Sequence, residues 1–296
     1  MKDAFSKLHP ITNLLFFVFA IGFSMFLMHP VCLALSLVIS LFTAVQLNGK
    51  RTAAFSIKFL LPMLVLTVII NPVFNHRGAT ILEYLPWGNP LTLESVIYGV
   101  AAAVLLCSAV LWFSCFHRVM TSDKFIYLFG KIMPSLSLLL SMTLRFVPQF
   151  RMQLQSVRKA YKAIGKDMSD GSVIKRIRHG VKILSLMISW SLEHAIETAD
   201  SMKSRGYGLK GRTSYSLYHI TKTDKIYIVI MLAEVVFLLV MLFTKQLQCR
   251  YFPTVKCELF SASVILFYGV YALFLLTPLI INLKEEIRWK RLQSAI

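Results

Sequence analysis

The longest apolar stretch of the chain sets the first limit on its fold. It begins at Ile11 and ends at Leu47, about twice the ~20 residues that an α-helix needs to cross a bilayer. His29 and Pro30 lie near its middle, and a proline there favours a break between two helices. The stretch therefore predicts two membrane-spanning helices joined by a tight turn.

Other apolar segments are long enough to cross a membrane as helices. They cover approximately 55–74, 93–116, 226–244 and 260–283. The mean hydropathy of the chain, +0.66, is also far above that of a soluble domain. We therefore expect an all-α integral membrane protein with about six transmembrane helices, to which long amphipathic helices are added. The Gly/Pro-rich residues 75–91 are expected to form a loop.

Basic residues predict the orientation of these helices. The chain carries 32 Lys+Arg and 14 Asp+Glu, a net charge of +18. Residues 151–215 hold 13 Lys/Arg and 5 Asp/Glu, so 13 − 5 = +8, and such an excess is typical of cytoplasmic segments. We therefore place residues 151–215 and both termini in the cytoplasm, which requires residues 132–150 to dip into the membrane or lie along it. Nucleic acid is not an expected partner, because the basic residues flank apolar spans.

One loop departs from this charge rule. Residues 245–257 are expected outside, although they carry Lys245, Arg250 and Lys256. The same loop holds Cys249 and Cys257, for which a disulfide and free thiols are both open.

The resulting organisation has three parts. Residues 1–131 form membrane helices 1–4 with their loops, 132–215 a helical cytoplasmic region, and 216–296 membrane helices 5–6 with a cytoplasmic tail.

Two amphipathic helices are predicted within the cytoplasmic region. Apolar residues recur every three or four positions, which places one apolar stripe on each helix. The stripes consist of Phe150, Leu154, Val157, Tyr161 and Ile164 on the first helix, and of Val173, Ile177, Val181, Leu184, Ile188, Leu192, Ala195, Ala199 and Met202 on the second. Such helices form a platform for partner proteins or lie flat on anionic lipid.

The end of the second helix is the sharpest local signal. Gly206 and Gly208 suit a helix C-cap, and Arg205 stands where the helix stops. A guanidinium at this position projects without crowding and can make a fork of hydrogen bonds to a carboxylate. By itself, the tripeptide Ser204–Gly206 is equally compatible with a capping glycine beside a solvated arginine.

Several short motifs together resemble one family. The segment ADSMKSRGYG, which ends at Gly208, resembles the second arginine motif of the transmembrane T component of energy-coupling factor (ECF) transporters, which are ABC-type importers of vitamins and transition-metal ions. Leu8-His9-Pro10 precedes the first span, as in that family. The segment from Arg145 to Pro148 resembles its arginine-phenylalanine-x-proline segment before the coupling helices. Residues Ala163, Ile164 and Gly165 fall where the first arginine motif stands, although Ile164 replaces its usual arginine.

The resemblance implies a fold with cytoplasmic coupling helices and a non-catalytic role. A T component binds two ABC ATPase subunits through the ends of these helices and holds a substrate-binding membrane protein, the S component. ATP-driven closure would move the coupling helices and reorient the S component for uptake of a vitamin or metal ion. The expected ATPase-coupling residues are Ser204, Arg205 and Gly206 with Ala163, Ile164 and Gly165, and the expected structural candidates are Arg145, Pro148 and Glu234.

Other kinds of site are less well supported by the sequence. Glu234 lies near the middle of a span, where a carboxylate is costly and is a functional candidate or a hydrogen-bonded packing group. No metal-ligand spacing and no P-loop are present, so neither a metal, a cofactor nor intrinsic ATP hydrolysis is expected. Two alternatives stay open: an intramembrane enzyme that uses His194 and nearby acids on lipid or peptide, and a secondary transporter, which would require inverted repeats.

Overall fold

The computed structural model describes residues 3–49, 56–84, 88, 90–165, 172–209, 218–244, 249–257 and 261–294. The chain divides into two compact units. The first, which we call the membrane unit, comprises residues 1–125 and 218–296; the second, which we call the crossed-helix unit, comprises residues 126–217. Each unit is described by itself.

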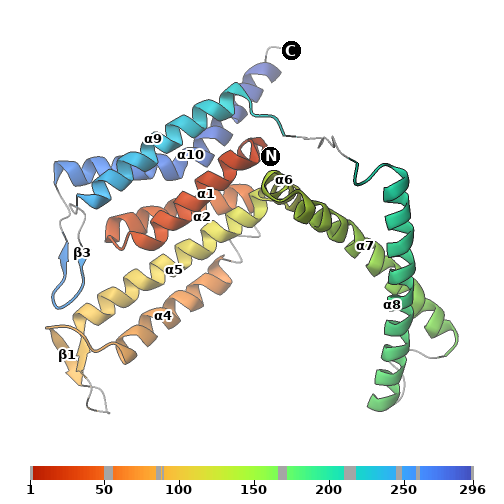
Figure 1. Ribbon diagram of the computed structural model, residues 1–296. Coiled ribbons are helices and arrows are strands. Elements are labelled where there is room, and N and C mark those ends of the chain that lie inside the picture. Colours follow the sequence, from red (N-terminus) through yellow and green to blue (C-terminus); the bar gives the residue numbers. More distant parts are fainter. Residues whose placement is uncertain are drawn as a thin grey trace. The chain divides into compact units, whose positions relative to one another are not determined.

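The membrane unit is a bundle of apolar helices. Four of them are long and apolar enough to cross a membrane: α2 (Pro30–Asn48), α5 (Leu93–Val119), α9 (Lys222–Phe243) and α10 (Ala262–Gln293). Two shorter apolar helices join them, α1 (Pro10–Phe26) and α4 (Leu61–Phe74), the latter following a short π-helix, η2 (Ser56–Leu60). Figure 1 shows α1, α2, α4 and α5 packed side by side, with α9 and α10 along the other edge. The protein is an all-α membrane protein, as the apolar runs predict.

The predicted break at His29–Pro30 is confirmed. α1 ends at Phe26 and α2 begins at Pro30, with His29 at its N-cap. Proline suits the first turn of a helix because the backbone N–H groups of that turn have no acceptor within the helix, so the N–H that proline lacks is not needed. The same arrangement occurs at His9–Pro10: the His9 side chain accepts a hydrogen bond from the Ile11 amide, and the His9 amide donates to Asp224 at the start of α9.

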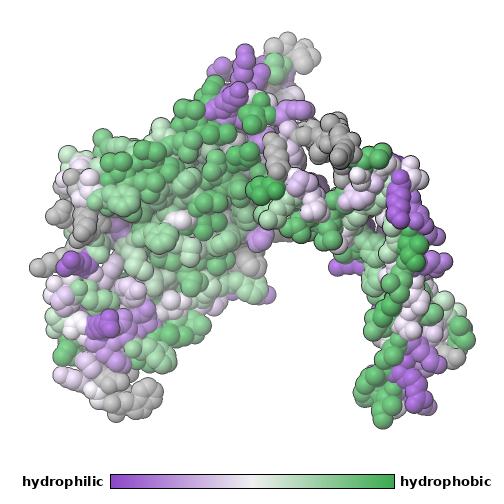
Figure 2. Space-filling view, in the orientation of Figure 1, coloured by the Kyte–Doolittle hydropathy of each residue, from purple (hydrophilic) through white to green (hydrophobic). Residues whose placement is uncertain are grey.

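Aromatic side chains fill the centre of the bundle. Phe16 contacts Trp112 and Phe274 with ring centroids 5.8 and 5.3 Å apart, so α1, α5 and α10 meet at this point. The Trp112 indole N–H donates to the Ser36 hydroxyl of α2 at 3.1 Å, which satisfies the one polar atom of a fully buried ring. Figure 2 shows apolar side chains spread over the outer surface of the same helices, as expected for a surface that faces lipid.

Short hairpins replace two of the expected loops. Strands β1 (Ile81–Tyr84) and β2 (Pro90–Thr92) pair antiparallel, so part of the segment expected as a loop over 75–91 forms a hairpin. Other amides of this segment bond outside it: the Ala79 amide donates to the Pro253 carbonyl at 3.0 Å and the Thr80 amide to the Glu94 carboxylate. Strands β3 (Cys249–Arg250) and β4 (Lys256–Cys257) also pair antiparallel, and a disulfide joins Cys249 to Cys257.

A buried lysine fixes the N-terminal segment to the bundle. Lys124 lies in α6 (Ser122–Ile132) with only 5% of its surface exposed, and its ammonium donates to the carbonyl of Ser6 in the short 3₁₀-helix η1 (Phe5–Lys7). In the orientation that satisfies both ends of the Asn13 amide, its oxygen accepts from Lys124 at 2.8 Å. Burial lowers the pKa of Lys124 to about 8, an effect that the nearby Asp3 carboxylate partly opposes.

The crossed-helix unit consists mainly of two long helices. α7 (Pro134–Ala163) and α8 (Val173–Ser204) cross one another, as Figure 1 shows in green. α7 is longer than the helix predicted over 150–164, because the apolar residues 134–149 form its first half. A proline in its first turn starts the helix at Pro134.

The face of α8 that packs against α7 is not its predicted apolar stripe. The side chains turned toward α7 are Ile183, Met187, Trp190, His194 and Thr198. The predicted apolar stripe lies roughly 110° around the helix, given 3.6 residues per turn, and its members from Val173 to Leu192 are exposed. The predicted stripe of α8 is therefore present but does not form its contact with α7, whereas on α7 Phe150, Leu154, Val157 and Tyr161 are partly buried.

Candidate coupling site

The C-terminus of α8 is built around Gly206. Arg205 is the C-cap residue, with φ −86° and ψ 9°, and Gly206 follows with φ +79°. The Gly206 amide donates to the Lys203 carbonyl at 2.9 Å and the Tyr207 amide to the Met202 carbonyl at 3.0 Å. This is the Schellman arrangement, which satisfies the last carbonyls of a helix and favours glycine at the left-handed position. The predicted cap at Gly206 is confirmed, and it holds Arg205 at the helix end.

The C-terminus of α7 has the same backbone geometry at its cap. Ile164 is the C-cap residue, with φ −91° and ψ 9°, and Gly165 follows with φ +71°. The Gly165 amide donates to the Lys162 carbonyl at 3.0 Å. Residues Ala163–Gly165 and Ser204–Gly206 therefore form equivalent helix ends, which differ in the exposed side chain that they present: 67% exposed isoleucine in one and arginine in the other.

The two helix ends lie on opposite sides of the crossing. Phe146 of α7 contacts Trp190 of α8 with centroids 5.6 Å apart, which marks the crossing point. At 1.5 Å per residue, Ile164 lies roughly 27 Å along α7 from Phe146, and Arg205 roughly 22 Å along α8 from Trp190. Arg205 shares a groove with residues from the first half of α7, whereas Ile164 ends its second half. Helices α7 and α8 thus end in two separate tips, one at Ile164 and one at Arg205.

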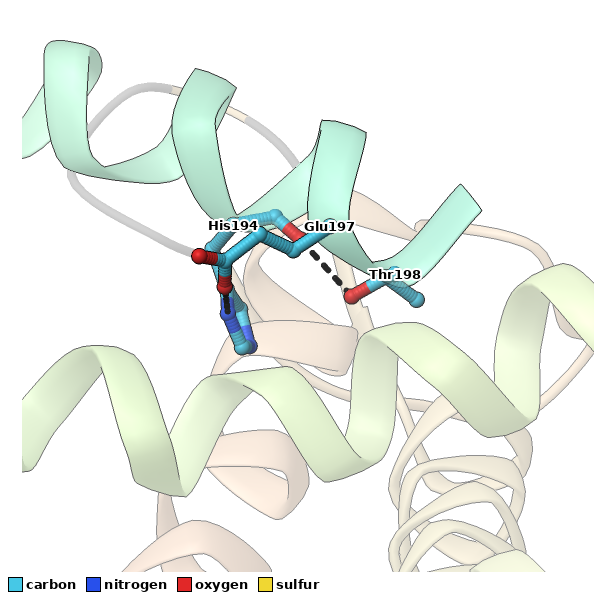
Figure 3. A network of polar contacts seen from close by, with 3 residues as sticks. All are labelled: His194, Glu197 and Thr198. Carbon is cyan, nitrogen blue, oxygen red and sulfur yellow. Dashed lines mark hydrogen bonds and ion pairs between the residues drawn. The ribbon is translucent and has the colours of Figure 1, made fainter. Parts of the chain in front are cut away.

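An aromatic stack holds the crossing together. His194 stacks on Trp190 with centroids 5.3 Å apart and an interplanar angle of 12°, and on Phe146 at 5.4 Å. Its Nδ1 lies 3.7 Å from the Glu197 carboxylate, and Thr198 donates to the His194 carbonyl at 2.7 Å (Figure 3). Such ring contacts each contribute about 0.5–1.5 kcal/mol beyond burial. The sequence reasoning missed this stack, although Phe146 with Phe150 and Trp190 with His194 stand at helical i, i+4 spacing.

A groove beside the crossing brings two arginines together. Its volume is about 690 Å³, and α7 contributes Arg145 to its lining while α8 contributes His194, Glu197, Ser201 and Arg205. The lining carries two guanidinium groups against one carboxylate, that of Glu197. The excess of positive charge and the hydroxyl donors suit an anionic group such as a carboxylate. Sequence reasoning selected both arginines separately and gave no sign that they share one groove.

The remaining sequence candidates lie elsewhere. Pro148 sits inside α7 together with Arg145, so the expectation that this segment precedes the coupling helices was wrong. Pro148 has no amide hydrogen, so the Leu144 carbonyl has no helical donor there. Glu234 lies half-buried in α9, and its Oε2 has no hydrogen-bond partner among the residues that the structure describes. The same residues contain no group of three or more His, Cys, Asp or Glu arranged to hold a metal ion.

Comparison with known proteins places this architecture in a family. Residues 2–215 match the model of the family CbiQ, described as cobalt transport protein. The matched residues include 2–125 of the membrane unit and 126–215 of the crossed-helix unit, which contains Arg205. The chain belongs to the CbiQ family.

Individual relatives of this CbiQ-family chain carry a more detailed description. The chain is 27% identical over 191 residues to the energy-coupling factor transporter transmembrane protein EcfT 1 of Listeria monocytogenes serotype 1/2a (strain 08-5578), covering 59% of this chain and 70% of the relative. It is 38% identical over 92 residues to EcfT of Lactobacillus helveticus (strain DPC 4571), covering 31% of this chain and 33% of that relative. It is 27% identical over 197 residues to EcfT of Lactococcus lactis subsp. cremoris (strain MG1363), covering 62% and 73%. The resemblance to T components is confirmed.

Proposed function

We propose that this CbiQ-family protein is the transmembrane energy-coupling subunit of an ECF-type ABC importer. It passes the ATP-driven motion of two ATPase subunits through α7 and α8 to a substrate-binding S component, and so drives uptake of a vitamin or metal ion. The protein itself does not hydrolyse ATP. The observation that carries the proposal is the pair of equivalent helix ends at Ile164 and Arg205, because two separate tips suit two ATPase subunits.

Arg205 is the contact that transmits force at one tip. Its charge is fixed at physiological pH and its planar fork fits a carboxylate on the ATPase. Arg145 lines the same groove and adds a second positive charge that favours the incoming acid. The Schellman cap ties Arg205 to the long helix α8, so a pull on the guanidinium is passed to the helix rather than absorbed by a loose loop.

The S component is proposed to rest on the apolar side chains that α8 leaves exposed. Ile177, Val181, Leu184 and Ile188 form a continuous stripe on the side away from α7. In a membrane protein such a stripe faces lipid or another membrane protein. A partner seated on this stripe would be displaced whenever α8 moves, which is the step that the proposed mechanism needs.

Substitution of Arg205 tests the coupling role. Losing one partner of a desolvated charge pair costs about 2–5 kcal/mol, so Arg205→Ala should abolish capture of the ATPase subunits or uncouple ATP hydrolysis from uptake. Arg205→Lys should rescue only partly, because an ammonium cannot reproduce the bidentate contact. Arg176→Ala, an exposed arginine of α8 outside the groove, is the matched control and should behave as wild type.

The measurements are pull-down of the ATPase subunits and substrate uptake in cells, with membrane insertion checked for every variant. Full complex and full uptake by Arg205→Ala would contradict the proposal. The unit would then be better explained as a platform that lies on anionic lipid.

A further inference from the structure

An apolar groove opens between α2 and α5 on the membrane unit. Its volume is about 480 Å³, and its lining includes Leu33 and Ala34 of α2, Val100 and Ala101 of α5, and Tyr251 of the β3–β4 hairpin. No charged residue is among the lining residues. Both bordering helices are long and apolar enough to cross a membrane, so hydrocarbon surrounds this groove.

The length of the groove matches one leaflet of the bilayer. Its α2 residues run from position 30 to 38 and its α5 residues from 96 to 104, which corresponds to roughly 12 Å along each helix. One leaflet contributes about 15 Å to the hydrocarbon core, and a transmembrane helix of a partner would need a contact of about 30 Å. The groove therefore suits a lipid chain of one leaflet better than a spanning helix.

The hairpin that lines the groove carries aromatic residues of the kind found at the depth of lipid headgroups. The Tyr251 hydroxyl donates to the Met28 carbonyl at 2.6 Å, in the turn between α1 and α2. The Tyr98 ring contacts Tyr251 and Phe252 with centroids 5.6 and 5.3 Å apart. Tyrosines with one apolar and one hydrogen-bonded end gather where hydrocarbon meets headgroups.

A second, smaller cavity is also lined by residues of this hairpin. Its volume is about 280 Å³, and its lining includes Leu27, His29, Leu242 and Arg250. His29 and Arg250 directly precede Pro30 and Tyr251 of the apolar groove, so residues next to one another in the chain line the two cavities. Arg250 is exposed and forms no ion pair with any residue that the structure describes.

We propose that this pair of cavities binds an anionic phospholipid, with one acyl chain in the α2–α5 groove and the phosphate at Arg250. Phospholipid chemistry accounts for an apolar slot of one-leaflet length whose hairpin also carries an unpaired guanidinium. It also accounts for the basic residues of the 245–257 loop, which the positive-inside rule leaves unexplained. The proposal does not depend on the importer function or on which leaflet holds the hairpin.

Photolabelling with matched lipids tests the site. The full chain is placed in phosphatidylcholine nanodiscs that contain a small amount of phosphatidylglycerol or phosphatidylcholine, each with the same photoactivatable group on its acyl chain. We expect phosphatidylglycerol to label residues 30–38 and 96–104 about fivefold more strongly, because one arginine near the surface favours an anionic lipid by about 1 kcal/mol. Equal labelling by the two lipids would overturn the proposal and indicate general bilayer contact.

Two variants separate the chain and headgroup contacts. Ala34→Phe fills the groove from an exposed position of α2 and should reduce labelling at least tenfold, whereas Leu41→Phe, exposed on the same helix outside the groove, should not. Arg250→Gln should remove the preference for phosphatidylglycerol, and Arg291→Gln on α10 should keep it. Labelling that survives Ala34→Phe, a preference that survives Arg250→Gln, or a protein crosslinked at this groove in place of lipid would each refute the site.

Discussion

The cap glycine of α8 offers a sensitive test of how Arg205 is held. Gly206 has φ +79°, a conformation that costs an L-residue about 1–2 kcal/mol. The added Cβ of Gly206→Ala would also lie 3.1 Å from Leu209 Cδ1, the flexible end of a side chain that can move aside. We therefore expect the capped end to lose about 1–2 kcal/mol, a factor of roughly 5–30 in its population relative to frayed forms.

Two measurements should report this loss. The amides of Gly206 and Tyr207 donate to the Lys203 and Met202 carbonyls, so their hydrogen exchange should accelerate by the same 5–30-fold factor. In a titration of labelled ATPase subunits onto the chain in nanodiscs, the affinity should fall by a similar factor, because binding must first restore the cap.

A matched control and a double substitution make the reasoning refutable. Gly208→Ala carries a comparable backbone cost, since φ is +99° with nothing within 4 Å of its Cβ, but Gly208 makes no bond of the cap. Gly208→Ala should therefore leave the affinity for the ATPase subunits nearly unchanged. In the Arg205→Ala background, Gly206→Ala should add little, because the contact that it positions is gone. Equal effects of Gly206→Ala in both backgrounds, or an equal loss in Gly208→Ala, would refute a positioning role for the cap.

Two further predictions concern the buried lysine and the topology. Lys124 has its folded-state pKa lowered to about 8, below its ordinary value of 10.5, so the unfolded chain binds more protons between these values and stability should rise as the pH increases through this window. Raising the pH from about 7 to about 9.5 should stabilise the wild type by about 2 kcal/mol relative to Lys124→Met, measured by thermal unfolding in detergent; an unchanged difference would show that Lys124 is solvated. A cysteine introduced at residue 170 should react only with membrane-permeant reagents in intact cells, because residues 151–215 concentrate positive charge, and labelling by an impermeant reagent would reverse the proposed orientation.

The sequence predicts the helices of the membrane unit well because composition alone decides them. A single apolar run of sufficient length can satisfy all its backbone polar groups in hydrocarbon by forming a helix. Hydropathy does not show the break inside residues 11–47, but Pro30 does. The short hairpins cannot be predicted from apolar composition in this way. The pairing of β1 with β2 and of β3 with β4 depends on how the flanking helices bring the strand ends together, and this is not encoded in local composition.

The packing face of α8 shows a second limit of sequence reasoning. Periodicity correctly finds the apolar stripe of α8, but it does not tell which face of the helix packs against α7. In a membrane protein the most apolar face can point to lipid or to a partner, and on α8 the contact with α7 comes from another face, which includes Ile183, Met187 and Trp190. For the same reason the Arg145–Arg205 groove could not be predicted, since it depends on which faces of α7 and α8 meet.

The equivalence of the two helix ends leads to a last prediction. The caps at Ile164 and Arg205 share their φ and ψ values to within a few degrees, so the same backbone presents an isoleucine at one tip and an arginine at the other. Ile164→Arg should therefore be tolerated without loss of stability, because the side chain is 67% exposed and arginine is a good helix-end residue. It should retain or tighten ATPase binding in the same titration, and it should restore part of the binding lost in Arg205→Ala if both tips act on carboxylates. If Ile164→Arg instead weakens the complex, the α7 tip docks by apolar contact, and the two ATPase subunits must present different surfaces to the two ends.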